Sequence, residues 1–144
     1  MANIVPDSFK TDLLGGVFDF DSSGGSTFKL ALYTDISGLT TSTTAFTATN
    51  EVSTSGTNYS SGGNTLTNNG VAISSNIGFV DFADLTFSSV TLSAVGALIY
   101  KSGGSNEAVL VLDFGGTKTA TNGDFVVQFP TASSSAAIIR LGNA

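Results

Sequence analysis

The sequence contains no cysteine, no histidine and no tryptophan, and only two prolines among its 144 residues. Histidine is the commonest general base, and histidine and cysteine together supply most ligands of zinc, haem and iron–sulfur sites, so the usual forms of those sites are excluded. Carboxylates alone can still hydrolyse glycosides or bind Ca²⁺. Enzyme chemistry is therefore disfavoured, and we expect no catalytic residue, no metal and no cofactor.

Charge is also scarce, since charged residues make up 11% of the chain against about 25% in an average protein. Five basic residues stand against eleven acidic ones, which gives a formal net charge of −6 and an acidic isoelectric point. This balance repels phosphate backbones and anionic lipids, so neither nucleic acid nor a membrane is expected as a partner.

Long apolar runs and targeting signals are missing too. Residues 1–10 lack the basic and apolar regions of a signal peptide, and the longest apolar-rich run, residues 90–100, is shorter than the about 20 residues that span a bilayer. We expect a protein that is synthesised in a cytoplasm and does not enter a membrane.

What the chain does have is apolar material for a core, with 41% hydrophobic residues and 11 phenylalanines. From residue 17 onward the hydrophobic period is two. In residues 27–34 it places Phe28, Leu30 and Leu32 on one face, which predicts a strand with one buried face. The sequence therefore predicts an all-β fold, an antiparallel β-sandwich or jelly-roll-like single domain over residues 17–144, with about eight to ten strands.

Residues 1–16 are expected to form an N-terminal arm or short helix. Pro6 suits the first turn of a helix over residues 6–14, Phe9 and Leu13 lie one turn apart, and Gly15 and Gly16 can end it. Because a helix of two turns is not stable alone, it must dock on its own domain or on a neighbouring chain.

Other strands are predicted where alternation or short apolar runs recur between turn residues. They cover residues 17–20, 45–52, 65–73, 77–82, 90–100, 107–114, 124–129 and 136–141. The first of them is expected to form a hairpin with residues 27–34. Glycine pairs such as Gly115-Gly116 are expected to act as turns between strands, and the polar segment 35–70 as exposed loops that can form a contact surface.

Two groups of aspartates are candidate sites. Asp19 and Asp21 open a calcium-loop pattern, but its twelfth position is Leu30 instead of glutamate, which favours an acidic turn. Asp81 and Asp84 form a carboxylate pair of the kind that glycosidases use, yet nothing around them indicates a cleft, and solvated turn residues are favoured.

Several tracts of the sequence resemble a family of small virion proteins of tailed bacteriophages, including phages of cyanobacteria and marine bacteria. The similar tracts are VPDSFKTDLL (5–14), TFKLALYT (27–34), FVDFAD (79–84), GALIYK (96–101), VLDFGG (111–116) and GDFVVQFP (123–130). The resemblance implies a capsid decoration, or cement, protein that lies on the capsid surface of the virion, after synthesis in the host cytoplasm. It implies the major capsid protein and further copies of this chain, as a homotrimer, as partners.

The candidate residues for contact with the capsid or a neighbouring subunit are apolar and lie mainly near the N-terminus. They are Ile4, Val5, Phe9, Leu13 and Phe46. Two alternatives remain open: a tail or neck component of the same virion, and a carbohydrate-binding β-sandwich whose sugar platform would be built from Tyr33, Tyr59 and Tyr100.

Overall fold

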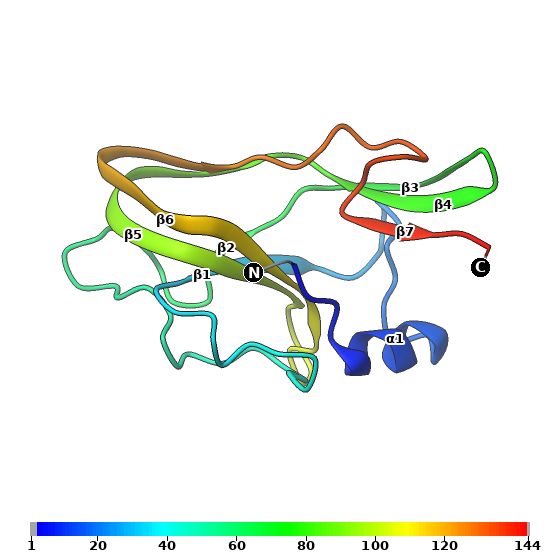
Figure 1. The fold of residues 1–144 in the computed structure, drawn as a ribbon, viewed down its shortest axis with the longest axis horizontal. Coiled ribbons are helices and arrows are strands. Elements are labelled where there is room, and N and C mark those ends of the chain that lie inside the picture. Colours follow the sequence, from blue (N-terminus) through cyan, green and yellow to red (C-terminus); the bar gives the residue numbers. More distant parts are fainter. Residues whose placement is uncertain (1–2, 144) are drawn as a thin grey trace.

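The computed structural model describes residues 3–143, which form one helix, seven strands and the loops between them. The helix is α1 (Asp7–Leu14), and the strands are β1 (Phe28–Tyr33), β2 (Asn64–Thr65), β3 (Asn68–Ser74), β4 (Ile77–Phe82), β5 (Leu85–Lys101), β6 (Ala108–Val127) and β7 (Ile139–Leu141). One antiparallel sheet has the order β2-β1-β5-β6 and the other the order β3-β4-β7 (Figure 1). The predicted all-β antiparallel sandwich with a short N-terminal helix is confirmed.

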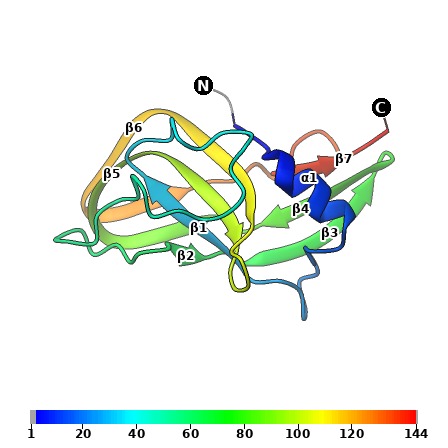
Figure 2. The same ribbon diagram turned by 90° about the horizontal axis from the view of Figure 1, so that it is seen from below.

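Helix α1 matches the predicted residues 6–14 to within one residue. Pro6 precedes it in an extended conformation, and Gly15 follows its last residue. Phe9, which is 3% exposed, anchors the helix to the core beside Phe18, with ring centroids 5.0 Å apart. The helix lies beneath the three-stranded sheet (Figures 1 and 2), so it docks on its own domain.

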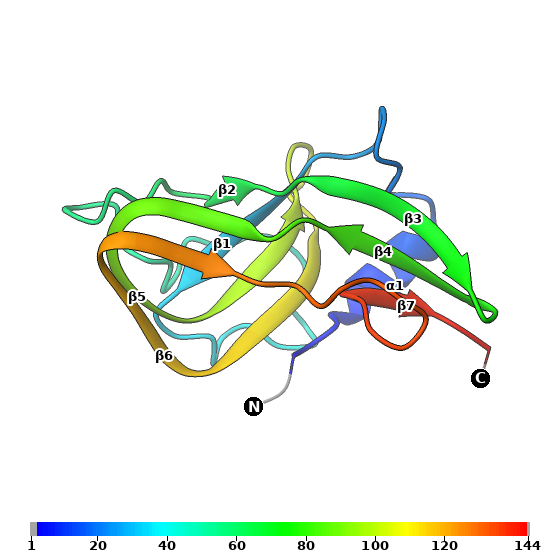
Figure 3. The same cartoon turned by 90° about the horizontal axis from the view of Figure 1, so that it is seen from above.

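The hairpin of β5 and β6 is the longest element and curls strongly around the core (Figure 3). We predicted separate strands at 107–114 and 124–129, but β6 runs through both. Residues 114–117 bulge out opposite Val95, between the pairs Ala94–Lys118 and Gly96–Asp113. Gly115 and Gly116 have positive φ angles of 75° and 147°, so they allow this bulge and the bend instead of ending the strand.

Two other predicted strands are not strands in the structure. Residues 17–20 pair with no strand: the Ser26 amide donates to the Asp19 carbonyl and closes a turn, while Phe18 and Phe20 enter the core. Residues 45–52 form only isolated bridges at Ala45 and Glu51. The described residues therefore contain seven strands and not eight to ten, because these segments bury their apolar side chains from loops.

Strand β1 is buried on both faces, so the prediction of one buried face is wrong. Phe28, Leu30 and Leu32 face the main core between the two sheets, whereas Ala31 and Tyr33 face a second apolar cluster on the opposite side. All five of these side chains are at most 1% exposed. Alternation along the strand could not reveal the second cover, because that cover is supplied by the polar loop that follows β1 and folds back over it.

The three-stranded sheet begins with the hairpin of β3 and β4. Ser75 and Asn76 join the strands in a two-residue turn, and both have positive φ, as in type I′ hairpins. The register places one set of side chains on the face toward α1, and they are Val71, Ile73, Gly78, Val80, Ile139 and Leu141. A stack of phenylalanine rings joins this sheet to the larger one, with Phe28 centred 4.6 Å from Phe20 and 5.7 Å from Phe82.

Candidate functional site: a loop layer and an apolar groove

Residues 34–63, which connect β1 to β2, form a layer over one face of the four-stranded sheet; we call them the loop layer (Figure 2). Ile36, Leu39 and Phe46 anchor it, and the Phe46 ring stacks on Tyr100 at 4.8 Å. Backbone hydrogen bonds also fasten it at both edges, from Val52 to Leu32 and from Phe46 to Asn106. A connection this long without regular structure is uncommon in compact domains and usually has a function.

A polar cluster around Glu51 holds the middle of the loop layer. Tyr59 donates a hydrogen bond of 2.8 Å to the Glu51 carboxylate, and the Ser61 hydroxyl and the Gly62 amide donate to the same group. The Tyr59 oxygen in turn accepts the Leu32 amide of β1 at 3.0 Å. Glu51 therefore ties three points of the loop layer together, and Tyr59 links them to β1. Sequence reasoning missed Glu51, although it is the one charged residue within 36–63.

The three tyrosines of the chain surround this carboxylate. Tyr33 donates to the Thr47 carbonyl at 2.6 Å, and Tyr100 donates to the Gly62 carbonyl at 2.7 Å. Burial raises the pKa of the Tyr33, Tyr59 and Tyr100 hydroxyls above the ordinary value, most strongly for Tyr33 and Tyr59, and the negative charge of Glu51 raises each of them further. The phenols thus remain neutral donors that fix the loop layer.

The outer surface of the loop layer is polar, nearly uncharged and locally ordered. Short side-chain bonds close its turns, from the Ser37 amide to Asp35, from the Ser42 amide to Thr40 and from the Ser55 amide to Ser53. The Ser37 amide and hydroxyl also hold the pKa of the Asp35 carboxyl below its usual value. These side chains fix the local turn conformations through bonds within the chain.

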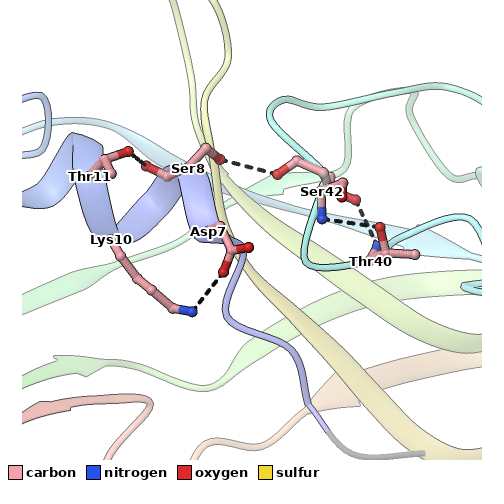
Figure 4. A network of polar contacts seen from close by, with 7 residues as sticks. Asp7, Ser8, Lys10, Thr11, Thr40 and Ser42 are labelled. Carbon is pink, nitrogen blue, oxygen red and sulfur yellow. Dashed lines mark hydrogen bonds and ion pairs between the residues drawn. The ribbon is translucent and has the colours of Figure 1, made fainter.

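The loop layer also holds the start of α1. Ser8 donates to the Thr43 carbonyl at 3.1 Å, and the Asp7 amide donates to the Thr41 carbonyl at 2.9 Å. Figure 4 shows Ser8 facing the turn that contains Thr40 and Ser42. The N-terminal helix and the loop layer therefore form one continuous surface of the domain.

A second candidate surface is a groove between α1 and the three-stranded sheet. Two adjoining hollows share Leu13, Ile139 and Leu141 and together form what we call the apolar groove. Its remaining lining includes Val5, Phe9, Lys10, Leu14, Phe18, Asp19, Phe20, Asp21, Val71, Ile73, Phe79, Val80 and Arg140. Within the described residues, five of the six exposed large apolar side chains line it, namely Val5, Leu14, Val71, Ile73 and Leu141.

The five predicted contact residues have different surroundings. Val5 is 42% exposed and lines the apolar groove with Leu13. Ile4 pairs with Val111 on the edge of β6, and Phe46 is half-buried against Tyr100. Phe9 needs correction as a contact residue, because it is 3% exposed and lies in the core of its own domain, where it also borders the groove. The structure brings Val5, Phe9 and Leu13 together and leaves Phe46 on the other side of the sheet.

The aspartates proposed as sites have structural partners. Asp81 accepts a hydrogen bond from Asn69, and Asp84 accepts the Phe129 amide at 2.8 Å. Asp19 accepts the Asp21 amide in a turn. Across residues 3–143, no group of three or more histidine, cysteine or acidic residues is placed to hold a metal ion.

The tyrosines cannot form a sugar platform in this conformation. Tyr33, Tyr59 and Tyr100 are 0%, 3% and 4% exposed, so none presents a ring face to solvent. Stacking on a sugar needs such a face. The carbohydrate-binding alternative thereby loses the aromatic residues on which it was based.

Comparison with protein families, with curated proteins and with solved structures finds no match to this chain. Among the described residues, no helix has both the length and the apolar character needed to cross a membrane. The function is therefore argued from the two surfaces and from the resemblance of the sequence tracts.

Proposed function

We propose that this chain is a structural protein of a tailed-phage particle, a capsid decoration protein that binds the outer surface of the head and stabilises its lattice. The sequence resemblance motivates the choice of particle. The observation that carries a binding role is the loop layer, a long connection whose turns and Glu51 cluster are ordered before any partner arrives. A preordered surface loses little conformational entropy on binding.

The chemistry of the loop layer suits a protein partner. Residues 34–63 contain two acidic residues, Asp35 and Glu51, and no basic residue. Glu51 is occupied by three donors from the loop layer itself, so the outward surface consists mainly of hydroxyl and amide groups. Such a surface fits hydrogen bonding to the major capsid protein, and its low charge limits repulsion between many neighbouring copies.

The first test is the copy number of the chain in purified virions, measured by quantitative mass spectrometry against the major capsid protein. We expect a number comparable to the positions of the capsid lattice. A number of a few copies, or a microscopy label confined to the tail, would replace the head assignment by a tail or neck component. Absence of the chain from the virion would reject the proposal that it is a protein of a phage particle.

The second test addresses the surface. Thr41 and Thr54 are exposed on the loop layer and make no side-chain hydrogen bond to a described residue, so Thr41→Glu and Thr54→Glu add charge without disturbing the fold. We expect both variants to lose binding to heads that lack the chain, measured by co-sedimentation. Thr117→Glu, on the bulge of β6, is the matched control and is expected to bind normally. Equal binding by all three variants would exclude the loop layer as the contact.

A further inference from the structure

We propose that the apolar groove is the surface on which a second copy of this chain docks. The first observation is the concentration of exposed apolar side chains. Leu14 is 89%, Ile73 77%, Leu141 61% and Val71 57% exposed, although all four line one groove. Soluble monomers rarely leave a contiguous apolar surface open, and such patches mark sites of association.

The second observation is the open edge of β3. The turn at Ser75 and Asn76 makes Ser74 and Ile77 the hydrogen-bonded pair next to it, and the pairing alternates from there. Val71 and Ile73 therefore point their amide and carbonyl groups away from β4. The strand contains no charged residue and no proline, which are the residues that usually protect an edge from further pairing.

The third observation is the distribution of charge along the groove, which favours a second copy of this chain as the partner. Asp19 and Asp21 line the groove where it meets β3, whereas Arg140 lines the part that meets α1 and β7. Lys10 lines that part too, but it is paired with Asp7 at 2.8 Å, so Arg140 supplies the positive charge there. A second copy can place its basic part against the acidic part of the first. A partner of one charge sign would be repelled at one of the two ends.

This inference does not rest on the proposed function, since copies can associate in the absence of a capsid. It also differs from the capsid contact in location, because the loop layer covers the four-stranded sheet and the groove lies under the three-stranded one. The two proposals can therefore fail separately. The resemblance implies a trimer. The stoichiometry measured below distinguishes a cyclic trimer from a dimer.

The test is the mass of the full chain in solution, measured by sedimentation equilibrium over a range of concentrations. We expect an oligomer of the unaltered chain that dissociates at least tenfold more readily with Ile73→Asp or with Leu14→Asp. Leu14 lies at the exposed end of α1, so its variant retains the fold even if Ile73→Asp does not. The matched control is Val126→Asp, which adds the same charge at an apolar residue on β6 that is 48% exposed and outside the groove.

A charge exchange tests the orientation. Asp21→Arg and Arg140→Asp are each expected to weaken the oligomer, and the double variant is expected to restore it, because the two ends remain complementary after both are reversed. A monomer at every concentration would overturn the proposal. So would an oligomer that survives both Ile73→Asp and Leu14→Asp, one that Val126→Asp weakens equally, or a double variant weaker than either single one.

Discussion

At the scale of single residues, the Glu51 cluster explains how a polar loop of this length stays ordered. Each tyrosine hydroxyl in the chain has a defined acceptor, and the Glu51 carboxylate accepts from three donors. A buried polar group destabilises the fold unless it forms a hydrogen bond. Removing one partner therefore leaves the remaining groups buried without a hydrogen bond, at the full cost of their desolvation. The Glu51 cluster therefore has a structural role in the fold.

This cluster predicts a loss of stability at alkaline pH. The pKa of Tyr33, Tyr59 and Tyr100 is raised in the folded chain, whereas it is about 10 in the unfolded chain. The unfolded state therefore loses protons first as pH rises above about 10, and the free energy of unfolding falls from there upward, while it is unaffected by these groups at lower pH.

The measurement is the near-ultraviolet absorbance of tyrosinate during a pH titration, with circular dichroism recorded in parallel. Because these are the only three tyrosines, the signal has no other source. Tyrosinate is expected to appear together with unfolding. Gradual ionisation near pH 10 in a chain that remains folded would contradict the burial of these hydroxyls.

At the scale of elements, α1 depends on one side chain. Phe9 is the single buried residue of the helix, and its ring lies 5.0 Å from Phe18 and 6.3 Å from Phe20. Helices of this length are not stable alone, so the helix persists because Phe9 and the contacts to the loop layer hold it.

We expect Phe9→Ala to lower the free energy of unfolding by about 3–5 kcal/mol, because it removes a buried ring and leaves a cavity. Thr11→Ala, at an exposed position of the same helix outside the apolar groove, is the control and is expected to change it by less than about 0.5 kcal/mol. Chemical denaturation followed by circular dichroism measures both. Equal effects of the two substitutions would show that the helix is held by something other than Phe9.

At the scale of the whole molecule, one core joins both sheets and the helix. Phe82 of β4 lies 5.7 Å from Phe28 of β1 and 6.3 Å from Phe129, measured between ring centroids. Neither sheet has a separate core on this side, so the two sheets are expected to unfold together.

Phe82→Ala tests this cooperativity. Tyr33 and Tyr100 lie in the apolar cluster on the far side of the large sheet, and Tyr59 lies in the main core beside Phe87. Their fluorescence therefore reports the large sheet and the loop layer, while far-ultraviolet circular dichroism reports all strands. We expect both signals to shift to the same lower denaturant midpoint, by a destabilisation of about 3–5 kcal/mol. Separate midpoints would mean that the three-stranded sheet unfolds as an independent unit.

Features that depend on local pattern follow from the amino-acid sequence alone. Helix α1 follows from Pro6, the spacing of Phe9 and Leu13, and the glycines after them, and β4 was predicted with its observed limits because its alternation and its bounding turns are both local. The missing histidine and cysteine likewise exclude sites that need imidazole or thiolate ligands.

Which segments cover one another follows from the three-dimensional packing. Ala31 and Tyr33 are buried because the loop layer lies over them, Gly115 and Gly116 bend a strand instead of ending it, and Leu14 meets Ile73 and Leu141 at one groove. Each of these facts depends on contacts between residues far apart in the chain, and hydrophobic period along one segment carries no information about what packs against it.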